Sequence, residues 1–210
     1  MLYNYVSVEG NIGSGKTLLA SMLADFFEAK LILERFSNNP FLPKFYESPQ
    51  QNAFPLELFF LAERYNQISK DITSPELFKN FTISDYSIFK SSLFAKVTLS
   101  SHELVLFSRL YDIILKNFPK PDLMIYLHSD IERIKKNIND RNREYEKNIK
   151  VDYLFKLQKA YHKFLNQTNN IRIVYIDVSK VDFKKDVNVF NKIAKTITTN
   201  YSLGLNKIYL

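Results

Sequence analysis

Short apolar runs alternate along this chain with stretches in which apolar residues recur every three or four positions. The apolar runs predict strands over residues 3–8, 31–33, 81–84, 123–127 and 171–176. The periodic stretches predict helices over residues 18–26, 58–68, 104–115 and 151–165, with a further helix that begins near Asp130. Strands that alternate with helices are typical of a parallel sheet covered by helices on both faces. We therefore expect an α/β fold with a five-stranded parallel sheet.

The segment from Gly10 to Thr17 carries the clearest chemical signal. It reads Gly10-Asn11-Ile12-Gly13-Ser14-Gly15-Lys16-Thr17, which matches the phosphate-binding pattern G-x-x-x-x-G-K-[ST] between a predicted strand and a predicted helix. Such a loop wraps a phosphate with backbone N–H groups, and the helix N-terminus adds positive charge. Lys16 can reach the outer phosphates, and the Thr17 hydroxyl can hold Mg²⁺. A fortuitous glycine-rich turn is the alternative, but the order of strand, loop and helix favours a nucleoside triphosphate site.

Composition narrows the class of protein. The chain has 210 residues, no repeat and no linker rich in Gly, Pro or Ser, which predicts one domain over residues 1–210. It has no cysteine, so neither a disulfide framework nor a thiolate metal site is available, as fits a reducing cytoplasm. No apolar run is long enough to span a bilayer, and the N-terminus leads straight into a predicted strand. We therefore expect a cytoplasmic protein rather than a secreted or membrane protein.

The positive charge of the chain has two readings. The formal net charge is +7, which would attract anionic partners such as nucleic acid. The lysines are scattered, however, and form no long block, which is typical of a solvated lysine-rich surface. We therefore expect no nucleic acid partner, and nucleotide phosphates account for any local excess of positive charge.

Carboxylates follow two of the predicted strands, at the edge where ligands collect in parallel sheets. Glu34 comes directly after residues 31–33, and Asp85 comes directly after residues 81–84. Either carboxylate can accept a proton from a hydroxyl that attacks a triphosphate, and Asp85 can instead help to hold Mg²⁺ through water. Taken alone, Glu34 is better explained as a surface residue at a strand end, and Asp85 can be merely a strand-end turn residue.

A charged run over residues 140–146 follows the helix that is predicted to begin near Asp130. Within it, Arg141 and Arg143 can close over a transferring phosphoryl group and offset its charge. A solvated charged loop is the alternative, and the presence of a phosphate-binding loop earlier in the chain favours an arginine lid.

Nearly the whole chain resembles the deoxynucleoside kinase family, whose motifs occur here in the family's order. Two features are specific to the family: the lid pattern Arg-x-Arg-x-x-Glu and a spacing of three residues on the nucleoside side. The lid pattern is matched by Arg141, Arg143 and Glu146, and the spacing is matched by Tyr46, Glu57 and Arg64. The resemblance implies a P-loop kinase fold with an arginine lid, and it places the family's strand-end acids at Glu34 and Asp85.

The resemblance also implies a reaction and a set of binding residues. In the family, the 5′-hydroxyl of a deoxynucleoside attacks the γ-phosphate of ATP bound with Mg²⁺, and Lys16 and both lid arginines would neutralise the moving charge. Tyr46 and Glu146 would bind the sugar 3′-hydroxyl. Arg64 would lie near the base, and Phe94 and Phe89 would stack on it. Asp182 and Phe183 would flank the ATP adenine. The resemblance to the family also implies a homodimer.

Two positions depart from the family pattern. The family usually has Gln where this chain has Glu57, and Arg where this chain has Tyr86. Lys90, four residues after Tyr86, could supply the replacement charge if that stretch is helical. An ionised Glu57 offers two acceptors, which suits the adjacent N1–H and N2–H₂ donors of guanine. We therefore expect a purine kinase with deoxyguanosine ahead of deoxyadenosine, unless Glu57 is protonated or pairs with Arg64.

Two other functions stay open at this point. A nucleoside monophosphate kinase of the thymidylate type needs a cationic site for the acceptor's own phosphate, whereas Tyr46, Glu57 and Glu146 suit a neutral nucleoside. A non-catalytic nucleotide-binding subunit is supported only by the missing arginine at Tyr86.

Overall fold

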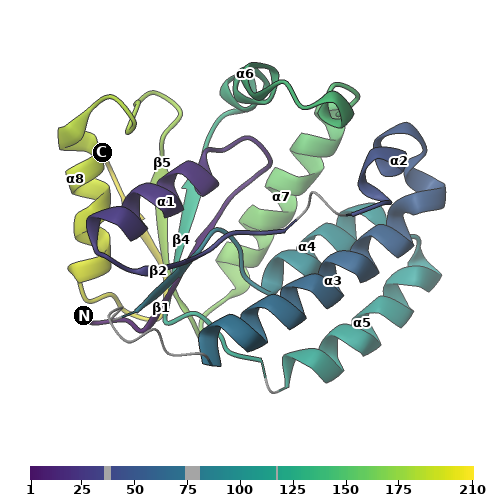
Figure 1. Ribbon diagram of the computed structural model, residues 1–210, viewed down its shortest axis with the longest axis horizontal. Coiled ribbons are helices and arrows are strands. Elements are labelled where there is room, and N and C mark those ends of the chain that lie inside the picture. The colour runs from purple at the N-terminus through teal and green to yellow at the C-terminus, as the bar shows by residue number, and fades with distance from the viewer. Residues whose placement is uncertain (36–38, 74–80, 117) are drawn as a thin grey trace.

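A parallel sheet runs through the centre of the molecule (Figure 1). The computed structural model describes residues 1–35, 39–73, 81–116 and 118–210. In this part of the chain the sheet has six strands in the order β2-β3-β1-β4-β5-β6, and each neighbouring pair is parallel. The strands are β1 (Tyr5–Glu9), β2 (Lys30–Ile32), β3 (Thr82–Ser84), β4 (Leu123–His128), β5 (Arg172–Asp177) and β6 (Gly204–Ile208).

The expected number of five strands is wrong, because β6 was not predicted. Its sequence, Gly-Leu-Asn-Lys-Ile, contains no apolar run, since the strand lies at the edge of the sheet and is mostly half-buried. The five strands predicted from apolar runs are all present. The α/β class and the parallel sheet are therefore confirmed, with one more strand than expected.

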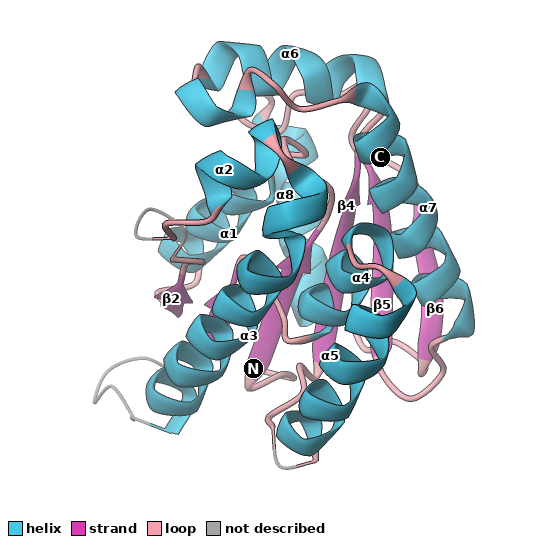
Figure 2. Ribbon diagram, turned by 90° about the vertical axis from the view of Figure 1, so that its right-hand side faces the viewer, coloured by secondary structure: helices cyan, strands magenta, loops and turns pink. Residues whose placement is uncertain are grey.

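Helices cover both faces of the sheet, as expected (Figures 1 and 2). They are α1 (Lys16–Phe26), α2 (Leu42–Glu47), α3 (Pro49–Thr73), α4 (Phe89–Thr98), α5 (Ser101–Leu115), α6 (Ile131–Arg141), α7 (Val151–Gln167) and α8 (Val187–Lys195), with 3₁₀ turns at Glu144–Glu146 and Thr196–Thr198. Helices α1 and α8 pack on one face, and α4 and α7 pack on the other. Helices α3 and α5 lie against α4.

Strand β4 shows why the apolar runs predicted strands well. Leu123, Ile125 and Leu127 pack into the core on the side of α1 and α8. Met124 and Tyr126 pack on the opposite side, against α7. Because successive side chains of a strand point to opposite faces, a strand that is covered on both sides is apolar at every position.

Helix α6 lies over the carboxyl edge of the sheet and leads into the lid (Figure 1). Asp130 caps it by accepting a hydrogen bond of 2.8 Å from the backbone N–H of Arg133. The helix ends at Arg141, and Asn142 then adopts a left-handed conformation with φ of 50°. The 3₁₀ segment Glu144–Glu146 that follows this turn packs against α2. Within the described ranges, none of the helices has the length and hydrophobicity needed to cross a membrane.

Candidate active site

The predicted phosphate-binding loop connects β1 to α1 at the carboxyl edge of the sheet. Gly13 has a φ of 76°, and a Cβ atom there would lie 2.9 Å from the carbonyl oxygen of Ile134 on α6. A Cβ atom on Gly10 would lie 2.7 Å from the carbonyl oxygen of Leu127 on β4. Asn137 on α6 also donates a hydrogen bond of 2.8 Å to the carbonyl of Gly13. The loop is therefore held closely against β4 and α6, and glycine is required at both positions.

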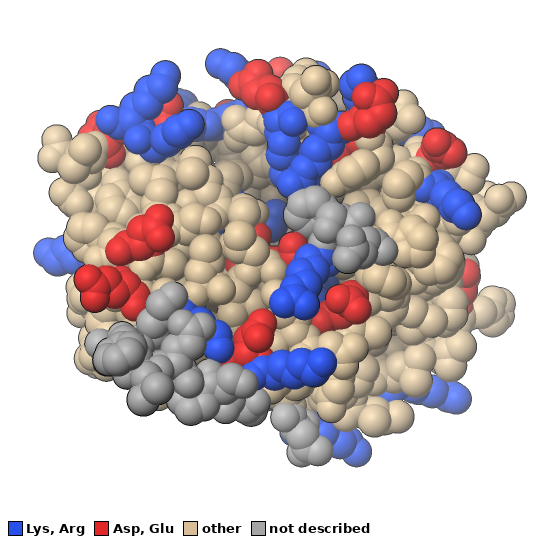
Figure 3. All heavy atoms as spheres, in the orientation of Figure 1, with Lys and Arg blue, Asp and Glu red and all other residues tan. Residues whose placement is uncertain are grey.

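A cleft beside this loop collects the groups that suit a triphosphate. It is lined by Gly13, Ser14, Gly15, Lys16, Thr17, Leu18, Arg133, Asn137, Asp140, Arg141, Arg143, Asp182, Phe183 and Lys184. Lys and Arg side chains border a hollow in the upper part of the face shown in Figure 3. Two of the lining residues, Arg133 and Asn137, were missed by the sequence analysis. The available signal was that Arg133, Asn137 and Arg141 follow one another at intervals of four positions, which places them on one face of α6.

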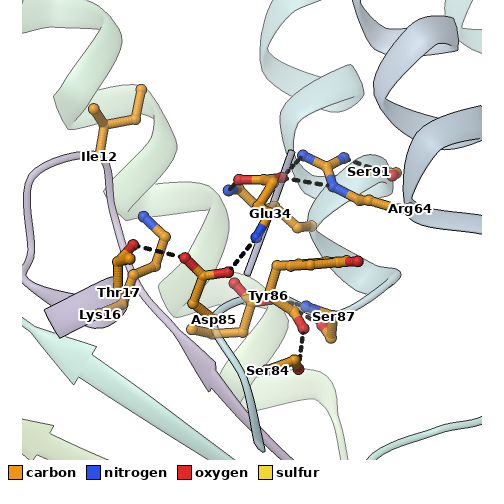
Figure 4. Close-up of polar contacts among 12 residues, drawn as sticks. Ile12, Lys16, Thr17, Glu34, Arg64, Ser84, Asp85, Tyr86, Ser87 and Ser91 are labelled. Atoms are coloured by element: carbon orange, nitrogen blue, oxygen red, sulfur yellow. Dashed lines mark hydrogen bonds and ion pairs between the residues drawn. The ribbon is translucent and has the colours of Figure 1, made fainter. Parts of the chain in front are cut away.

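The first residues of α1 meet Asp85 at the end of β3. The Thr17 hydroxyl donates a hydrogen bond of 2.6 Å to Asp85 Oδ2, and the backbone N–H of Glu34 donates one of 2.7 Å to Asp85 Oδ1 (Figure 4). Asp85 therefore joins the phosphate-binding loop to the end of β2. Lys16 lies beside this pair, and burial, together with nearby Lys90, lowers the pKa of its ammonium to about 8.

Glu34 is held between two cations. Its Oε1 accepts hydrogen bonds of 2.9 and 2.6 Å from the Arg64 guanidinium (Figure 4). Its Oε2 is paired with the Lys90 ammonium. Burial by itself would raise the pKa of Glu34, but Lys90 and Arg64 hold it well below its usual range. Glu34 is therefore ionised at neutral pH, and its two oxygens are fixed in direction.

The structure places Lys90, and not residue 86, on the cationic side of this cluster. Lys90 is on the first turn of α4, and its ammonium also lies 5.4 Å from the centre of the Phe94 ring. Tyr86 is fully buried, and its hydroxyl donates a hydrogen bond of 2.9 Å to Gln67 on α3. Position 86 thus contributes to the core, whereas Lys90 supplies the positive charge.

A second pocket opens next to Glu34 and brings together the residues predicted to bind the nucleoside, with the exception of Phe89. Its lining includes Glu34, Tyr46, Glu57, Phe60, Arg64, Lys90, Phe94, Arg141, Arg143, Tyr145, Glu146 and Tyr153. Phe94 is among these residues, but Phe89 instead packs against Phe164, with ring centres 5.5 Å apart. Phe89 therefore lies outside the lining of this pocket, because its ring belongs to the contact between α4 and α7.

Glu57 lies deep in this pocket and is 1% exposed. Its Oε1 accepts a hydrogen bond of 3.1 Å from the Thr98 hydroxyl, and its Oε2 has no partner among the described residues. The Arg64 guanidinium turns to Glu34 and, over 2.7 Å, to the Ser91 hydroxyl. Burial raises the pKa of Glu57 to about 7, although the positive charge of Arg64 opposes this shift.

The lid arginines Arg141 and Arg143 line both pockets and are held by Glu146. Arg141 donates hydrogen bonds of 3.0 and 2.7 Å to the buried Glu146 carboxylate, and Arg143 lies 3.4 Å from it. The ring of Tyr145 stacks on that of Tyr46 from α2, with centres 6.3 Å apart and planes within 6°. The lid is therefore attached to the nucleoside side of the site by both charge and ring contacts.

Comparison with known proteins identifies the family. The family model described as "Deoxynucleoside kinase" matches residues 6–201. The chain belongs to the deoxynucleoside kinase family. It is 34% identical over 196 residues to a deoxyguanosine kinase of Bacillus subtilis, covering 90% of this chain and 94% of that protein. It is 30% identical over 207 residues to a deoxyadenosine kinase of Lactobacillus acidophilus, covering 91% of this chain and 94% of that protein.

A solved structure confirms the fold of this kinase. The deoxyadenosine kinase from M. mycoides with bound dATP superimposes with a TM-score of 0.78 at 20% identity, covering 93% of this chain and 99% of that chain. The predicted P-loop kinase fold is therefore confirmed. Membership of the family makes this chain an ATP-dependent phosphotransferase that acts on deoxynucleosides. Membership of the family therefore rules out the two alternatives left open by the sequence, a nucleoside monophosphate kinase and a non-catalytic nucleotide-binding subunit.

One further residue of this kinase could not be found from motifs. Glu9, at the end of β1, is buried and accepts hydrogen bonds of 2.6 Å from both the backbone N–H and the hydroxyl of Ser87. Its other oxygen accepts a bond of 2.9 Å from the Tyr161 hydroxyl on α7. Glu9 therefore fixes the turn that separates Asp85 from Lys90, and only the packing of three distant segments reveals this.

Proposed function

We propose that this kinase transfers the γ-phosphoryl group of ATP to the 5′-hydroxyl of a purine deoxynucleoside and favours deoxyguanosine over deoxyadenosine. The observation that carries the proposal is the buried Glu57 carboxylate, whose Oε2 faces no partner in the described part of the chain. Guanine presents two adjacent donors, N1–H and N2–H₂, which match two carboxylate oxygens. The relatives named for deoxyguanosine and deoxyadenosine support a purine substrate.

On the acceptor side, Glu34 serves as the general base for the 5′-hydroxyl. Its ion pairs with Arg64 and Lys90 keep it charged and aim its oxygens, which favours positioning of the nucleophile. Tyr46 and Glu146, which both line the pocket, bind the sugar 3′-hydroxyl. Phe94, which also lines the pocket, stacks on the base, while Arg64 holds the edge of the site through Glu34.

On the phosphate side, Lys16, Arg141 and Arg143 offset the charge of the moving phosphoryl group. Asp182 and Phe183 flank the ATP adenine next to the loop glycines. The Thr17 hydroxyl and the Asp85 carboxylate, 2.6 Å apart, are oxygen donors of the kind that Mg²⁺ accepts, so the residues present fit this ion. Thr17 and Asp85 would hold the ion, and Mg²⁺ would supply positive charge that offsets the charge of the phosphates.

A panel of deoxynucleosides tests the base preference through coupled ADP release. We expect the highest kcat/KM with deoxyguanosine, and Glu57→Gln should shift the preference toward deoxyadenosine by about 5- to 150-fold, because an unmatched buried acceptor costs roughly 1–3 kcal/mol. Glu63→Gln, on the same helix and outside the pocket lining, is the matched control. A wild type that prefers a pyrimidine, or a ratio that Glu57→Gln leaves unchanged, would contradict the role of Glu57.

We also propose that the kinase is cytoplasmic, since it consumes ATP. We further propose that it forms a homodimer, since α5 presents an apolar outer face. Val105, Leu106 and Ile113 on this face are 56%, 50% and 67% exposed. Ile113→Glu should convert the dimer into a folded monomer, because a buried unpaired charge opposes association. Light scattering after size exclusion measures the mass, and a wild type that elutes as a monomer would end this proposal.

A further inference from the structure

The Thr98 hydroxyl, at the end of α4, has two acceptors for one hydrogen. It lies 3.1 Å from Glu57 Oε1 and 3.0 Å from the backbone carbonyl of Phe94. A hydroxyl donates one hydrogen bond at a time, and it can accept others through its lone pairs. The roles proposed above for the active site make no use of Thr98.

This arrangement satisfies Glu57 Oε1 in two protonation states. When Glu57 is ionised, Thr98 donates to Oε1. When Glu57 is protonated and no base is bound, a proton on Oε1 can be donated to the Thr98 oxygen, and Thr98 turns its own hydrogen to the Phe94 carbonyl. A buried polar atom without a hydrogen-bond partner costs free energy. Because Thr98 can be a partner for Oε1 in both cases, neither the ionised nor the protonated form of Glu57 pays that cost. In each state Oε2 is left for a ligand in the pocket.

The charged groups that act on Glu57 oppose one another, and burial outweighs the attraction of the nearby cations. The lid residues Arg141, Arg143 and Glu146 line the same pocket. Arg64 on α3 and Lys90 on α4 favour the ionised form, while burial and Glu34 favour the neutral form. Tyr46 on α2 and Tyr153 on α7 are neutral phenols, whose pKa values are raised mainly by burial and in part by Glu57 itself. The pKa of Glu57 at about 7 follows from this balance.

We propose that Glu57 and Thr98 together read the base in two states, with ionised Glu57 binding guanine and protonated Glu57 binding adenine. This inference rests on the proposed function, in which Glu57 faces the base. The ionised carboxylate accepts hydrogen bonds from guanine N1–H and N2–H₂. The protonated carboxyl, with its proton on Oε2 and Thr98 again donating to Oε1, donates to adenine N1 and accepts from the adenine N6 amino group. One site thus takes both purines, and the proton comes from solvent.

A competition assay tests this inference. The wild-type enzyme receives ATP with equal concentrations of deoxyguanosine and deoxyadenosine, and both monophosphates are measured from the same reaction. The product ratio equals the ratio of the two kcat/KM values, so the titration of Lys16 and any loss of folded enzyme cancel. Because one proton separates the two states, the ratio of guanine to adenine product should rise about tenfold per pH unit between about pH 6 and 8. A ratio that is independent of pH would overturn the inference.

Two variants assign the effect to its residues. Glu57→Gln should give a ratio that favours adenine and does not change with pH. Thr98→Val removes the hydroxyl at nearly constant volume. The ionised form then loses a charge-assisted hydrogen bond where the protonated form loses a weaker neutral one, so the pH of equal product formation should move upward. Thr98→Ser should restore the wild-type profile. If the product ratio of Thr98→Val depends on pH as in the wild type, Thr98 takes no part in reading the base.

The two proposals fail differently in this assay. Absence of both products, or a ratio that Glu57→Gln does not alter, would contradict the proposed function itself. Formation of both products, with a ratio that Glu57→Gln alters but that is flat with pH in the wild type, would contradict only the two-state reader.

Discussion

Lys16→Ala should lower kcat by about three orders of magnitude or more, an effect comparable to that of other cations that stabilise a transferring phosphoryl group. The ammonium is nearly buried at the start of α1, donates a hydrogen bond of 3.3 Å to the Asn11 carbonyl, and faces the cleft beside the loop. Its charge serves the phosphates and makes no ion pair that the fold needs among the described residues. Coupled ADP release measures kcat, and circular dichroism against temperature checks the fold.

Lys159→Ala is the matched control for this experiment. Lys159 is exposed on α7, away from both pockets, and its loss should leave kcat within error. If Lys16→Ala kept a kcat within a few-fold of wild type, the assignment of the loop to the phosphates of ATP would be wrong. A loss of activity that came with a much lower melting temperature would show that Lys16 supports the fold instead.

Glu34→Gln should lower kcat by about 10²–10⁴, the range for a positioned general base, with a smaller change in the KM for the nucleoside. The amide keeps the shape of the side chain but cannot take the proton of the 5′-hydroxyl. Since Arg64 and Lys90 hold the pKa of Glu34 well below its usual range, kcat should show no acid limb from Glu34 near neutral pH.

Asp85→Asn separates the two strand-end acids. Asp85 is bonded to Thr17 and to the backbone of Glu34, so this variant should mainly raise the Mg²⁺ concentration needed for half-maximal rate. Full activity in Glu34→Gln combined with an inactive Asp85→Asn at saturating Mg²⁺ would reverse the two roles.

Local sequence predicted the parts of this molecule that depend on neighbours along the chain. The phosphate-binding loop is one such part, because its glycines, Lys16 and Thr17 act within a single turn. The buried strands are another, because a strand covered on both faces must be apolar throughout. Strand β6 escaped detection because an edge strand carries little of that signal.

The remainder of the site depends on contacts between distant segments, which no local pattern encodes. Glu57 and Thr98 are 41 positions apart, and they meet only because α3 packs on α4. The family usually has arginine where this chain has Tyr86, and in the structure Lys90 supplies the positive charge beside Glu34 instead. The sequence could name Lys90 as a candidate from its spacing, but only the packing of α4 beside Glu34 shows that its ammonium reaches the carboxylate.

The stack between Tyr145 of the lid and Tyr46 of α2 has an optical consequence. The chain contains 13 tyrosines and no tryptophan. Its intrinsic fluorescence therefore comes from tyrosine, without energy transfer to tryptophan. Tyr46, Tyr145 and Tyr153 all line the nucleoside pocket, and two of them are in ring contact. Unlabelled enzyme therefore carries its own fluorophores at the point where lid and nucleoside meet, which gives stopped-flow experiments a direct view of that step.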